Sequence, residues 1–190
     1  MLDADDSVLC VIDVQRGFVD KLGEADGADR VIQRVVWIAA LARVLGIPMV
    51  ATAEEPDRNG PVLGGVEAQF PEGTPTFVKP VFALADVPEI LSAVEATGRR
   101  TAVLVGLETD VCVAQSALGL LDRGFRVAAV HDAVASPGAA HPDGLERMRA
   151  SGVTLVSAKG LCYEWVRTVE RAWQLERLMA DIPLPDGLTL

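Results

Sequence analysis

The sequence is poor in the features that mark secreted, membrane-spanning and nucleic-acid-binding proteins. It has only 3 cysteines in 190 residues and no C-x-x-C pair, which argues against a disulfide framework and a structural zinc site. No apolar run approaches the length of a membrane span or a signal-peptide core. Lys and Arg number 17 against 27 Asp and Glu, a formal net charge of −10, and they form no basic cluster that would suit nucleic acid. We therefore expect a soluble, cytoplasmic protein that binds neither membranes nor nucleic acid.

The apolar half of the sequence falls into short runs of two alternating kinds. Buried, β-branched runs predict strands at 8–12, 48–52, 76–78, 102–105, 126–130 and 153–156. Amphipathic stretches between them predict helices at 29–45, 88–97, from about 110, at 142–151 and from 159. This alternation predicts an α/β fold, a Rossmann-like three-layer α/β/α sandwich around a six-stranded, mostly parallel sheet.

Two further segments, 53–73 and 163–179, do not fit the strand and helix alternation and are interpreted separately. Residues 53–73 are rich in Pro and Gly, which predicts a long loop without regular structure, and loops of that length are usually functional. Residues 163–179 continue as a helix with more apolar surface than a helix facing water needs, so we expect it to pack on the body or in a homo-oligomer. We interpret residues 1–190 as one domain with 167–190 as a C-terminal helical extension and tail.

The stretch 102–122, AVLVGLETDVCVAQSALGLLD, carries a candidate nucleophile. A buried strand breaks at Gly106 and a helix restarts near Asp110, which places Cys112 in the exposed first turn of that helix. The positive end of the helix lowers the pKa of a thiol and can hold an oxyanion. Most free cysteines, however, are buried apolar residues, so this stretch alone leaves both interpretations open.

Two more reactive side chains are expected at the same edge of the sheet. Ligands bind outside the carboxyl ends of parallel strands, where Asp13 follows the first strand, Lys79 ends the third and Cys112 follows the fourth. A carboxylate can take the thiol proton, and an ammonium group can hold the charged forms and a developing oxyanion. Taken singly, Asp13 could cap a turn and Lys79 could be a solvated lysine. Their joint placement with Cys112 favours acyl transfer.

Five segments carry a resemblance to a known family: VIDVQRGF (11–18), FVKPVF (77–82), VLVGLETDVCVAQSALGLLDRG (103–124), HDAVAS (131–136) and RMRASGV (147–153). The chain resembles the isochorismatase-like cysteine hydrolases, which include nicotinamidases and N-carbamoylsarcosine amidase, over roughly residues 7–166. The resemblance implies that Asp13 is the general base, Lys79 its electrostatic partner and Cys112 the nucleophile. It also implies a cis peptide bond at Leu107–Glu108, with the backbone N–H groups of Glu108 and Cys112 forming an oxyanion hole.

The sequence departs from parts of this family in informative ways. Nicotinamidases carry metal-binding histidines in the loop after the second strand, but AEEPDRNGPVLGG (53–65) has none, and His131 and His141 lie elsewhere. We therefore expect no metal and no other cofactor. Isochorismatases proper lack the nucleophilic cysteine, so Cys112 favours the amidase-like branch.

These observations predict a cysteine hydrolase that attacks a small amide, ureido or related acyl substrate and forms a thioester. The alternative is a small-molecule-binding or scaffolding member of the same fold without turnover. A dinucleotide binder is disfavoured because DVQRGF (13–18) lacks G-x-G-x-x-G, and an aspartyl phosphatase because Gln15 stands where a second Asp would be needed. Gln15, Phe18 and Glu54 are predicted to line the substrate pocket, since they fall on the adjoining loops.

Overall fold

A six-stranded parallel sheet with the strand order β3-β2-β1-β4-β5-β6 forms the centre of the molecule. The computed structural model describes residues 1–190, apart from the side chain of residue 24. The strands are β1 (Ser7–Ile12), β2 (Met49–Glu54), β3 (Thr76–Lys79), β4 (Thr101–Leu107), β5 (Arg126–Ala135) and β6 (Thr154–Val156). The predicted six-stranded α/β fold is confirmed, and every strand pair is parallel.

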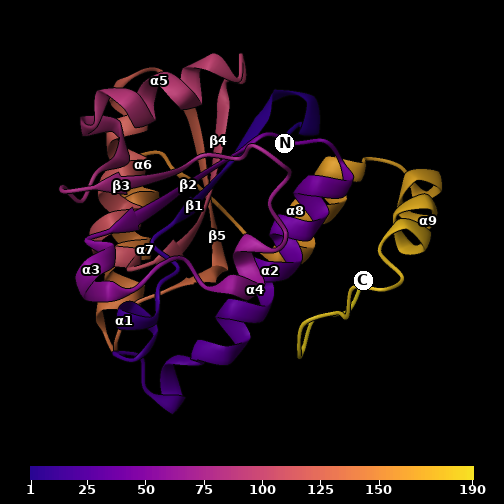
Figure 1. Ribbon diagram of the computed structural model, residues 1–190. Coiled ribbons are helices and arrows are strands. Elements are labelled where there is room, and N and C mark those ends of the chain that lie inside the picture. Colours follow the sequence, from indigo (N-terminus) through magenta and orange to yellow (C-terminus); the bar gives the residue numbers. More distant parts are fainter.

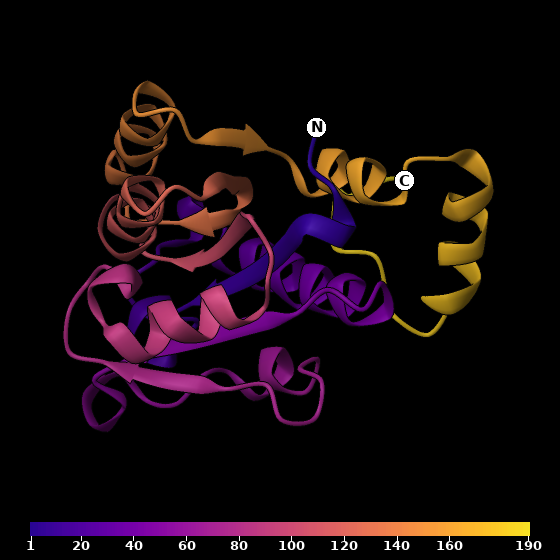
Figure 2. The ribbon, with the colours of Figure 1, turned by 90° about the horizontal axis from the view of Figure 1, so that it is seen from above.

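Helices cover both faces of this sheet (Figures 1 and 2). One face carries α2 (Ala28–Val44) and α8 (Ala158–Val166), and the other carries α5 (Pro88–Ala96), α6 (Ala114–Asp122) and α7 (Ala140–Ala150). Short elements join them, namely η1 (Ala4–Asp6), α1 (Arg16–Val19), η2 (Glu24–Asp26) and η3 (Leu84–Asp86). Among the described residues, no helix is long and apolar enough to cross a membrane.

The alternation of side chains along β1 explains why the core has two halves. Leu9 and Val11 pack into the cluster under α2 and α8, whereas Cys10 and Ile12 pack into the cluster under α5, α6 and α7. All six residues of β1 are buried, as a central parallel strand requires. Full burial of each large aliphatic side chain stabilises the fold by about 1.5–3 kcal/mol.

The segment 53–73 contains more regular structure than its composition predicts. It forms α3 (Pro56–Asn59) and α4 (Gly64–Glu67), so the expectation of an irregular loop was wrong. Pro56 stands in the first turn of α3, where its fixed φ angle favours a helix and its missing N–H is not needed. Gly60, with φ of 80°, ends the same helix. The residues that break structure elsewhere thus begin and end short helices here.

The predicted continuous helix at 163–179 is also wrong, because the chain turns at Arg167. Arg167 has φ of 65° and ends α8, and the Thr168 side chain then accepts a hydrogen bond from the Arg171 N–H to begin α9 (Val169–Leu178). Figures 1 and 2 show α9 and the C-terminal tail at the periphery, beside α8. Leu175 is buried against the α2 side of the core, whereas Trp173 is 60% exposed.

Candidate active site

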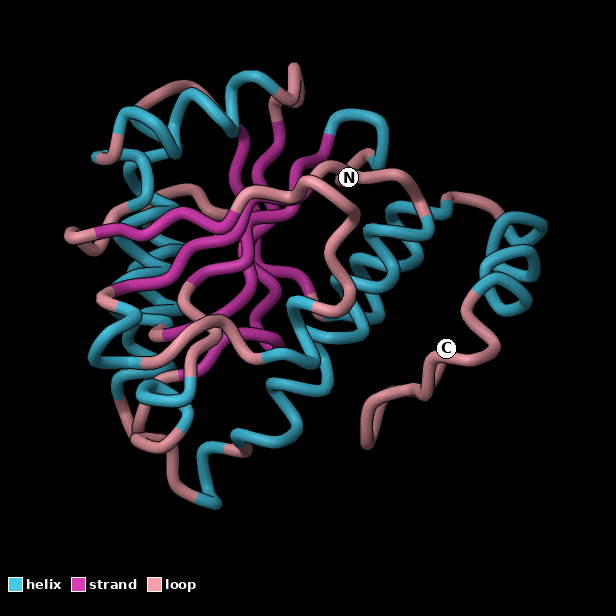
Figure 3. The backbone as a smooth tube through the Cα atoms, in the orientation of Figure 1, coloured by secondary structure: helices cyan, strands magenta, loops and turns pink.

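Four adjacent strands bring four reactive side chains to one edge of the sheet. In the order β3-β2-β1-β4, Lys79 is the last residue of β3, Glu54 the last of β2, and Asp13 follows β1. Cys112 lies in η4 (Thr109–Val113), a single π-helical turn after β4. Figure 3 shows the strands, in magenta, at the centre of the molecule with helices on both sides of them. The structure therefore brings Asp13, Lys79 and Cys112 together, and it adds Glu54 to them.

A close approach of β4 to β1 makes this meeting possible. Gly106 of β4 pairs with Ile12 of β1, has φ of 123°, and a Cβ atom there would lie 1.9 Å from the Ile12 carbonyl oxygen. Only glycine fits that position without a shift of the backbone. Because Asp13 follows Ile12 directly, the contact at Gly106 fixes the distance between the carboxylate and the segment that carries Cys112.

Asp13 is held rigidly at the end of β1. Its backbone has φ of 47°, a conformation that Asp tolerates better than most residues. Its Oδ1 atom accepts a hydrogen bond of 2.8 Å from Thr52 Oγ1, and its Oδ2 atom lies 2.6 Å from Lys79 Nζ. Both carboxylate oxygens of this fully buried side chain are thus engaged.

Lys79 places its ammonium group between two carboxylates. Besides Asp13, the Nζ atom lies 3.4 Å from Glu54 Oε2 and donates a hydrogen bond of 3.1 Å to the Val81 carbonyl oxygen. The side chain is fully buried, although Lys79 is carried by the outermost strand. A buried ammonium group needs such partners, because removing it from water without them is costly.

Cys112 differs from expectation in its exposure and in its partner. Its side chain is only 2% exposed, so the predicted exposed position was wrong. Its Sγ atom donates a hydrogen bond of 3.1 Å to Glu54 Oε2. The turn that carries Cys112 is closely packed under α7, where a Cβ atom on Gly144 would lie 2.7 Å from Asp110 Cα.

Contacts from Ser136, the residue after β5, and from His141 of α7 fix the turn that carries the thiol. The Ser136 hydroxyl donates to Asp110 Oδ1 at 2.6 Å and accepts from the Asp110 N–H at 3.3 Å. Thr109 Oγ1 lies 2.9 Å from His141 Nδ1, within hydrogen-bond distance. Both contacts are made to residues of η4 that precede Cys112, so they position the nucleophile without contacting its sulfur.

The charges in the site set its proton affinities. Burial, followed by the negative charge of Asp13, raises the pKa of the Cys112 thiol. Burial likewise raises the pKa of Asp13, although Lys79 and Thr52 oppose it. Burial disfavours the charge on Lys79, but Asp13, Cys112 and Glu54 outweigh this and raise the lysine pKa. The lowering of the thiol pKa expected from the helix start is therefore not found, because burial and two carboxylates outweigh one ammonium group.

The backbone before Cys112 has the geometry that the resemblance implies. The Leu107–Glu108 peptide bond is cis, and the Glu108 carbonyl oxygen accepts a hydrogen bond of 3.0 Å from the Val113 N–H. The Glu108 carboxylate lies 3.5 Å from Lys21 Nζ. The oxyanion hole formed by the N–H groups of Glu108 and Cys112 stays a prediction.

Of the three side chains predicted to line the substrate pocket, Glu54 alone contacts the reactive group. Gln15 is fully buried, and its side-chain amide bonds to the backbone of Glu54. It donates to the Glu54 carbonyl oxygen at 3.0 Å and accepts from the Glu54 N–H at 2.8 Å. Phe18 is buried in the core, with Lys21 Nζ 4.4 Å from its ring centre. Substrate contacts by Gln15 and Phe18 stay predictions.

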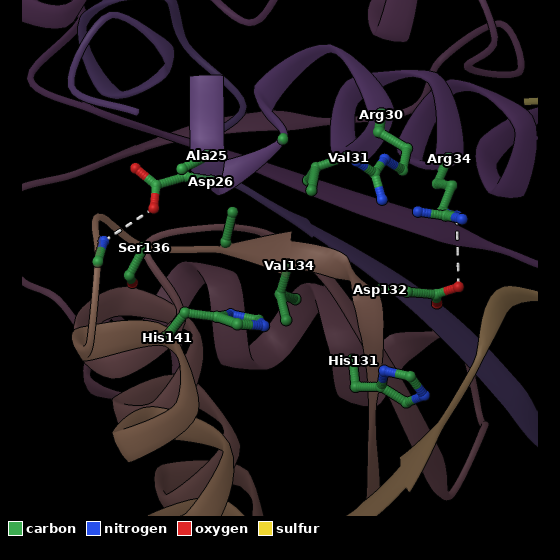
Figure 4. Close-up of a pocket in the computed structure, with 13 residues that line it drawn as sticks. Ala25, Asp26, Arg30, Val31, Arg34, His131, Asp132, Val134, Ser136 and His141 are labelled. Atoms are coloured by element: carbon green, nitrogen blue, oxygen red, sulfur yellow. Dashed lines mark hydrogen bonds and ion pairs between the residues drawn. The ribbon is translucent and has the colours of Figure 1, made fainter. Parts of the chain in front are cut away.

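The same site contains the side chains that could hold a metal ion. Among the described residues, one group of His, Cys, Asp and Glu donor atoms lies within 4.8 Å of one another, formed by Asp13, Glu54 and Cys112. The Lys79 ammonium group already supplies a positive charge there. His131 and His141 instead line a cavity of about 360 Å³ between α2, β5 and α7, beside Arg34 (Figure 4).

Comparison with known proteins assigns the family. Residues 7–160 match the model of the isochorismatase domain. The chain belongs to the isochorismatase family. A probable hydrolase, YcaC of Escherichia coli, is 33% identical over 134 residues, which are 70% of this chain and 64% of the relative.

Solved structures of this family have the same fold over almost the whole chain. YcaC of Pseudomonas aeruginosa, described with hexane-2,5-diol and covalent acrylamide, superimposes with a TM-score of 0.87 and 27% identity, covering 95% of this chain and 91% of that one. The YcaC structure from Escherichia coli, described as an octameric hydrolase of unknown specificity, gives a TM-score of 0.82 and 25% identity, covering 95% of each chain. The six-stranded sheet is thus the family fold.

Proposed function

We propose that this isochorismatase-family protein is a cysteine hydrolase that cleaves the C–N bond of a small amide, ureido or related acyl substrate. The observation that supports this most is the meeting of a thiol, an ammonium group and two carboxylates within hydrogen-bond or ion-pair distance, from four segments far apart in sequence. A nucleophile, a proton acceptor and a cation are the groups that acyl transfer needs. A metal-free route follows from this set, since Lys79 supplies the positive charge.

The reaction proceeds through a thioester. Cys112 Sγ loses its proton to a carboxylate and attacks the acyl carbon, while the carbonyl electron pair moves onto the oxygen. The backbone N–H groups of Glu108 and Cys112, and the charge of Lys79, stabilise that oxyanion. As the C–N bond breaks, the leaving nitrogen takes the transferred proton and departs as ammonia or an amine. A water molecule then gives a proton to Asp13 and attacks the thioester carbon, the C–S bond breaks, and the proton on Asp13 returns to the sulfur as the acid product leaves.

A screen of small amides and ureido compounds for ammonia or amine release, read by mass spectrometry, tests this function. We expect turnover with the wild type and background release with Cys112→Ala, because the variant has no sulfur to form the thioester. Cys162→Ala is the matched control, since Cys162 is also buried but lies in α8; it should retain activity. Substrate binding by the wild type with no turnover of any bound compound would instead favour the non-catalytic binding alternative.

We further propose that the protein acts in the cytoplasm as a homo-oligomer, with residues 1–190 as one domain and 167–190 as its helical extension. The exposed apolar side chains of α9 support the homo-oligomer: Val169, Trp173 and Leu178 are 67%, 60% and 66% exposed. A patch of that kind is typical of a surface that a second subunit covers. The octameric state of the Escherichia coli YcaC structure gives a precedent within the family.

A further inference from the structure

We propose that the cavity between α2, β5 and α7 binds a multivalent oxyanion with the chemistry of a phosphate group. Its volume of about 360 Å³ lies in the range of small-molecule sites, roughly 300–1,000 Å³. Both histidines of the chain and two arginines line it, namely His131, His141, Arg30 and Arg34. Side chains that carry or can acquire a positive charge thus gather around one space, in a chain whose formal net charge is −10.

Three elements far apart in sequence bring these side chains together. Arg30 and Arg34 are both on α2, and residues four apart lie on the same face of a helix. His131 belongs to β5, and His141 to the first turn of α7. Figure 4 shows the two arginines on the α2 side of the cavity and the two histidines on the opposite side. An anion between them would therefore meet cationic groups from both sides.

The aspartates of the same lining are already engaged. Asp26 accepts two hydrogen bonds from backbone N–H groups, of 2.8 and 2.9 Å, one at each carboxylate oxygen. Asp132 accepts one of 2.8 Å from the Ala158 N–H through Oδ1, and its Oδ2 lies 3.3 Å from Arg34 Nε. Because a guanidinium group has five N–H donors, Arg34 can bind an anion through its terminal nitrogens while its Nε stays beside Asp132. The side chain of Arg34 is only 12% exposed, and shelter from water strengthens such an interaction.

The amino-terminal end of α2 borders the cavity as well. Gly27, which lines the cavity, is the N-cap residue of this 17-residue helix and has no side chain to accept from the first-turn N–H groups. A Cβ atom on Gly27 would lie 3.7 Å from Arg30 Nη2, so the guanidinium group of Arg30 lies beside the start of the helix. The positive end of a helix dipole favours an anion. It thus adds to the charge of Arg30 at the same place.

The charge of the lining depends on the two histidines. The titratable and charged groups around the cavity are Asp26 of η2, Arg30 and Arg34 of α2, His131 and Asp132 of β5, and His141 of α7. The arginines and aspartates balance, so each proton that a histidine takes up adds one positive charge. Burial, followed by His131, lowers the pKa of His141, and Asp26 opposes this. A multivalent anion in the cavity would raise the pKa of both histidines, so anion binding and protonation should strengthen each other.

The cavity is separate from the reactive side chains, although one of its residues touches the turn that carries the thiol. Among the described residues that line it, none is one of the four reactive side chains of the active site. His141 Nδ1 lies 2.9 Å from Thr109 Oγ1 in η4, which leaves Nε2 of that ring for a ligand in the cavity. The proposed anion site therefore goes beyond the proposed hydrolase function and does not depend on it.

Titration with inorganic phosphate, followed by NMR of the histidine ring Cε1–H signals, tests the proposal. The chain has only 2 histidines, and both line the cavity, so each signal reports on it. We expect both signals to shift with the same dissociation constant. Saturating phosphate should raise the pKa of both histidines between about pH 5 and 8, and affinity for the protonated protein should increase about tenfold for each unit of that rise.

Arg30→Met and Arg43→Met complete the test, with affinity measured by calorimetry. Arg30 is exposed, so its replacement should leave the fold intact, and loss of its charge should weaken phosphate binding about tenfold. Arg43 is on α2 as well but donates to Gln69 Oε1 at 3.2 Å and does not line the cavity, so Arg43→Met should bind like the wild type. Equal losses in the two variants would overturn the proposal. Histidine shifts no larger than those caused by sodium chloride at the same ionic strength would also overturn it.

A phosphate monoester, titrated in the same way, distinguishes the two sources of this group. Tighter binding of the ester than of inorganic phosphate would support an organic phosphate that fills more of the cavity, and the reverse would support the free anion. Binding of neither would overturn the site. These measurements require no turnover, so their failure would leave the hydrolase proposal, which Cys112→Ala tests, unaffected.

Discussion

Replacement of Gly106 by alanine should separate β1 from β4 at the point where the active site is assembled. The added Cβ atom would lie 1.9 Å from the Ile12 carbonyl oxygen and 2.8 Å from its carbonyl carbon, distances at which the backbone must move. A non-glycine residue in a sparsely populated backbone region costs about 1–3 kcal/mol, and overpacking adds about 1–3 kcal/mol. We therefore expect Gly106→Ala to lower the free energy of unfolding by roughly 2–6 kcal/mol.

Urea denaturation at equilibrium measures this loss, and Gly73→Ala provides the matched control. Gly73 also has positive φ, 81°, but nothing lies within 4 Å of a Cβ atom built on it. The control therefore carries the backbone strain without the collision and should lose only about 1–2 kcal/mol. In the folded fraction of Gly106→Ala, acrylamide should also alkylate Cys112 at a different rate from the wild type, because the displaced strand β1 leads directly into Asp13. Equal losses of stability in the two variants would refute the reasoning from the close contact.

Three other predictions follow from the same structure. Acrylamide should label Cys112 before Cys10 or Cys162 in the folded protein. Burial raises the pKa of all three thiols, but Cys112 has a carboxylate, that of Glu54, in hydrogen-bond contact with its sulfur. Peptide mapping that finds another cysteine labelled first would contradict the assignment of the nucleophile. Lys79→Met should destabilise the fold by about 3–5 kcal/mol, the usual result of removing one partner of a buried ion pair. Because the pKa of Lys79 in the folded protein is raised above its ordinary value of 10.5, its contribution to stability is complete below pH 10.5 and is lost as the pH rises through the raised value. The urea midpoint of the wild type should therefore fall only above pH 10.5, and that of the variant should change less there. Trp173→Glu should shift the oligomer towards smaller species in light scattering, and a wild type that is already monomeric at micromolar concentration would show that α9 needs no partner.

The fold could be predicted from the sequence because the hydrophobic pattern that indicates each strand and helix is local and is repeated along the chain. Each strand is a short buried run and each crossover an amphipathic helix, so the pattern survives errors of a few residues at the boundaries. β5 is longer than predicted, reaching Ala135, because its register shifts opposite Leu104 and Gly106 and the strand resumes after polar residues. Periodicity alone carries no signal for such a shift.

The site was predictable only in part. The places of its residues at the strand ends could be predicted, but the contacts between their side chains could not. Asp13, Lys79 and Cys112 stand where strands end, and parallel strands end at one edge, so their meeting follows from topology. The link between Cys112 and Glu54 depends on the register of β2 against β3 and on the burial of η4 under α7. Neither could be derived from the pattern of hydrophobic residues. The raised thiol pKa was missed for the same reason, because the number of carboxylates around the sulfur was not known.

The position of Lys79 on the outermost strand has a consequence for how the site comes apart. β3 has four residues and pairs on one side only, with β2, whereas the strands that precede Asp13 and Cys112 are paired on both sides. Edge segments with few contacts open with less free energy than the global unfolding of a domain. Amide hydrogen exchange should therefore be faster in Thr76–Lys79 than in β1 and β4, and each opening would withdraw the cation from both carboxylates while the rest of the sheet stays folded.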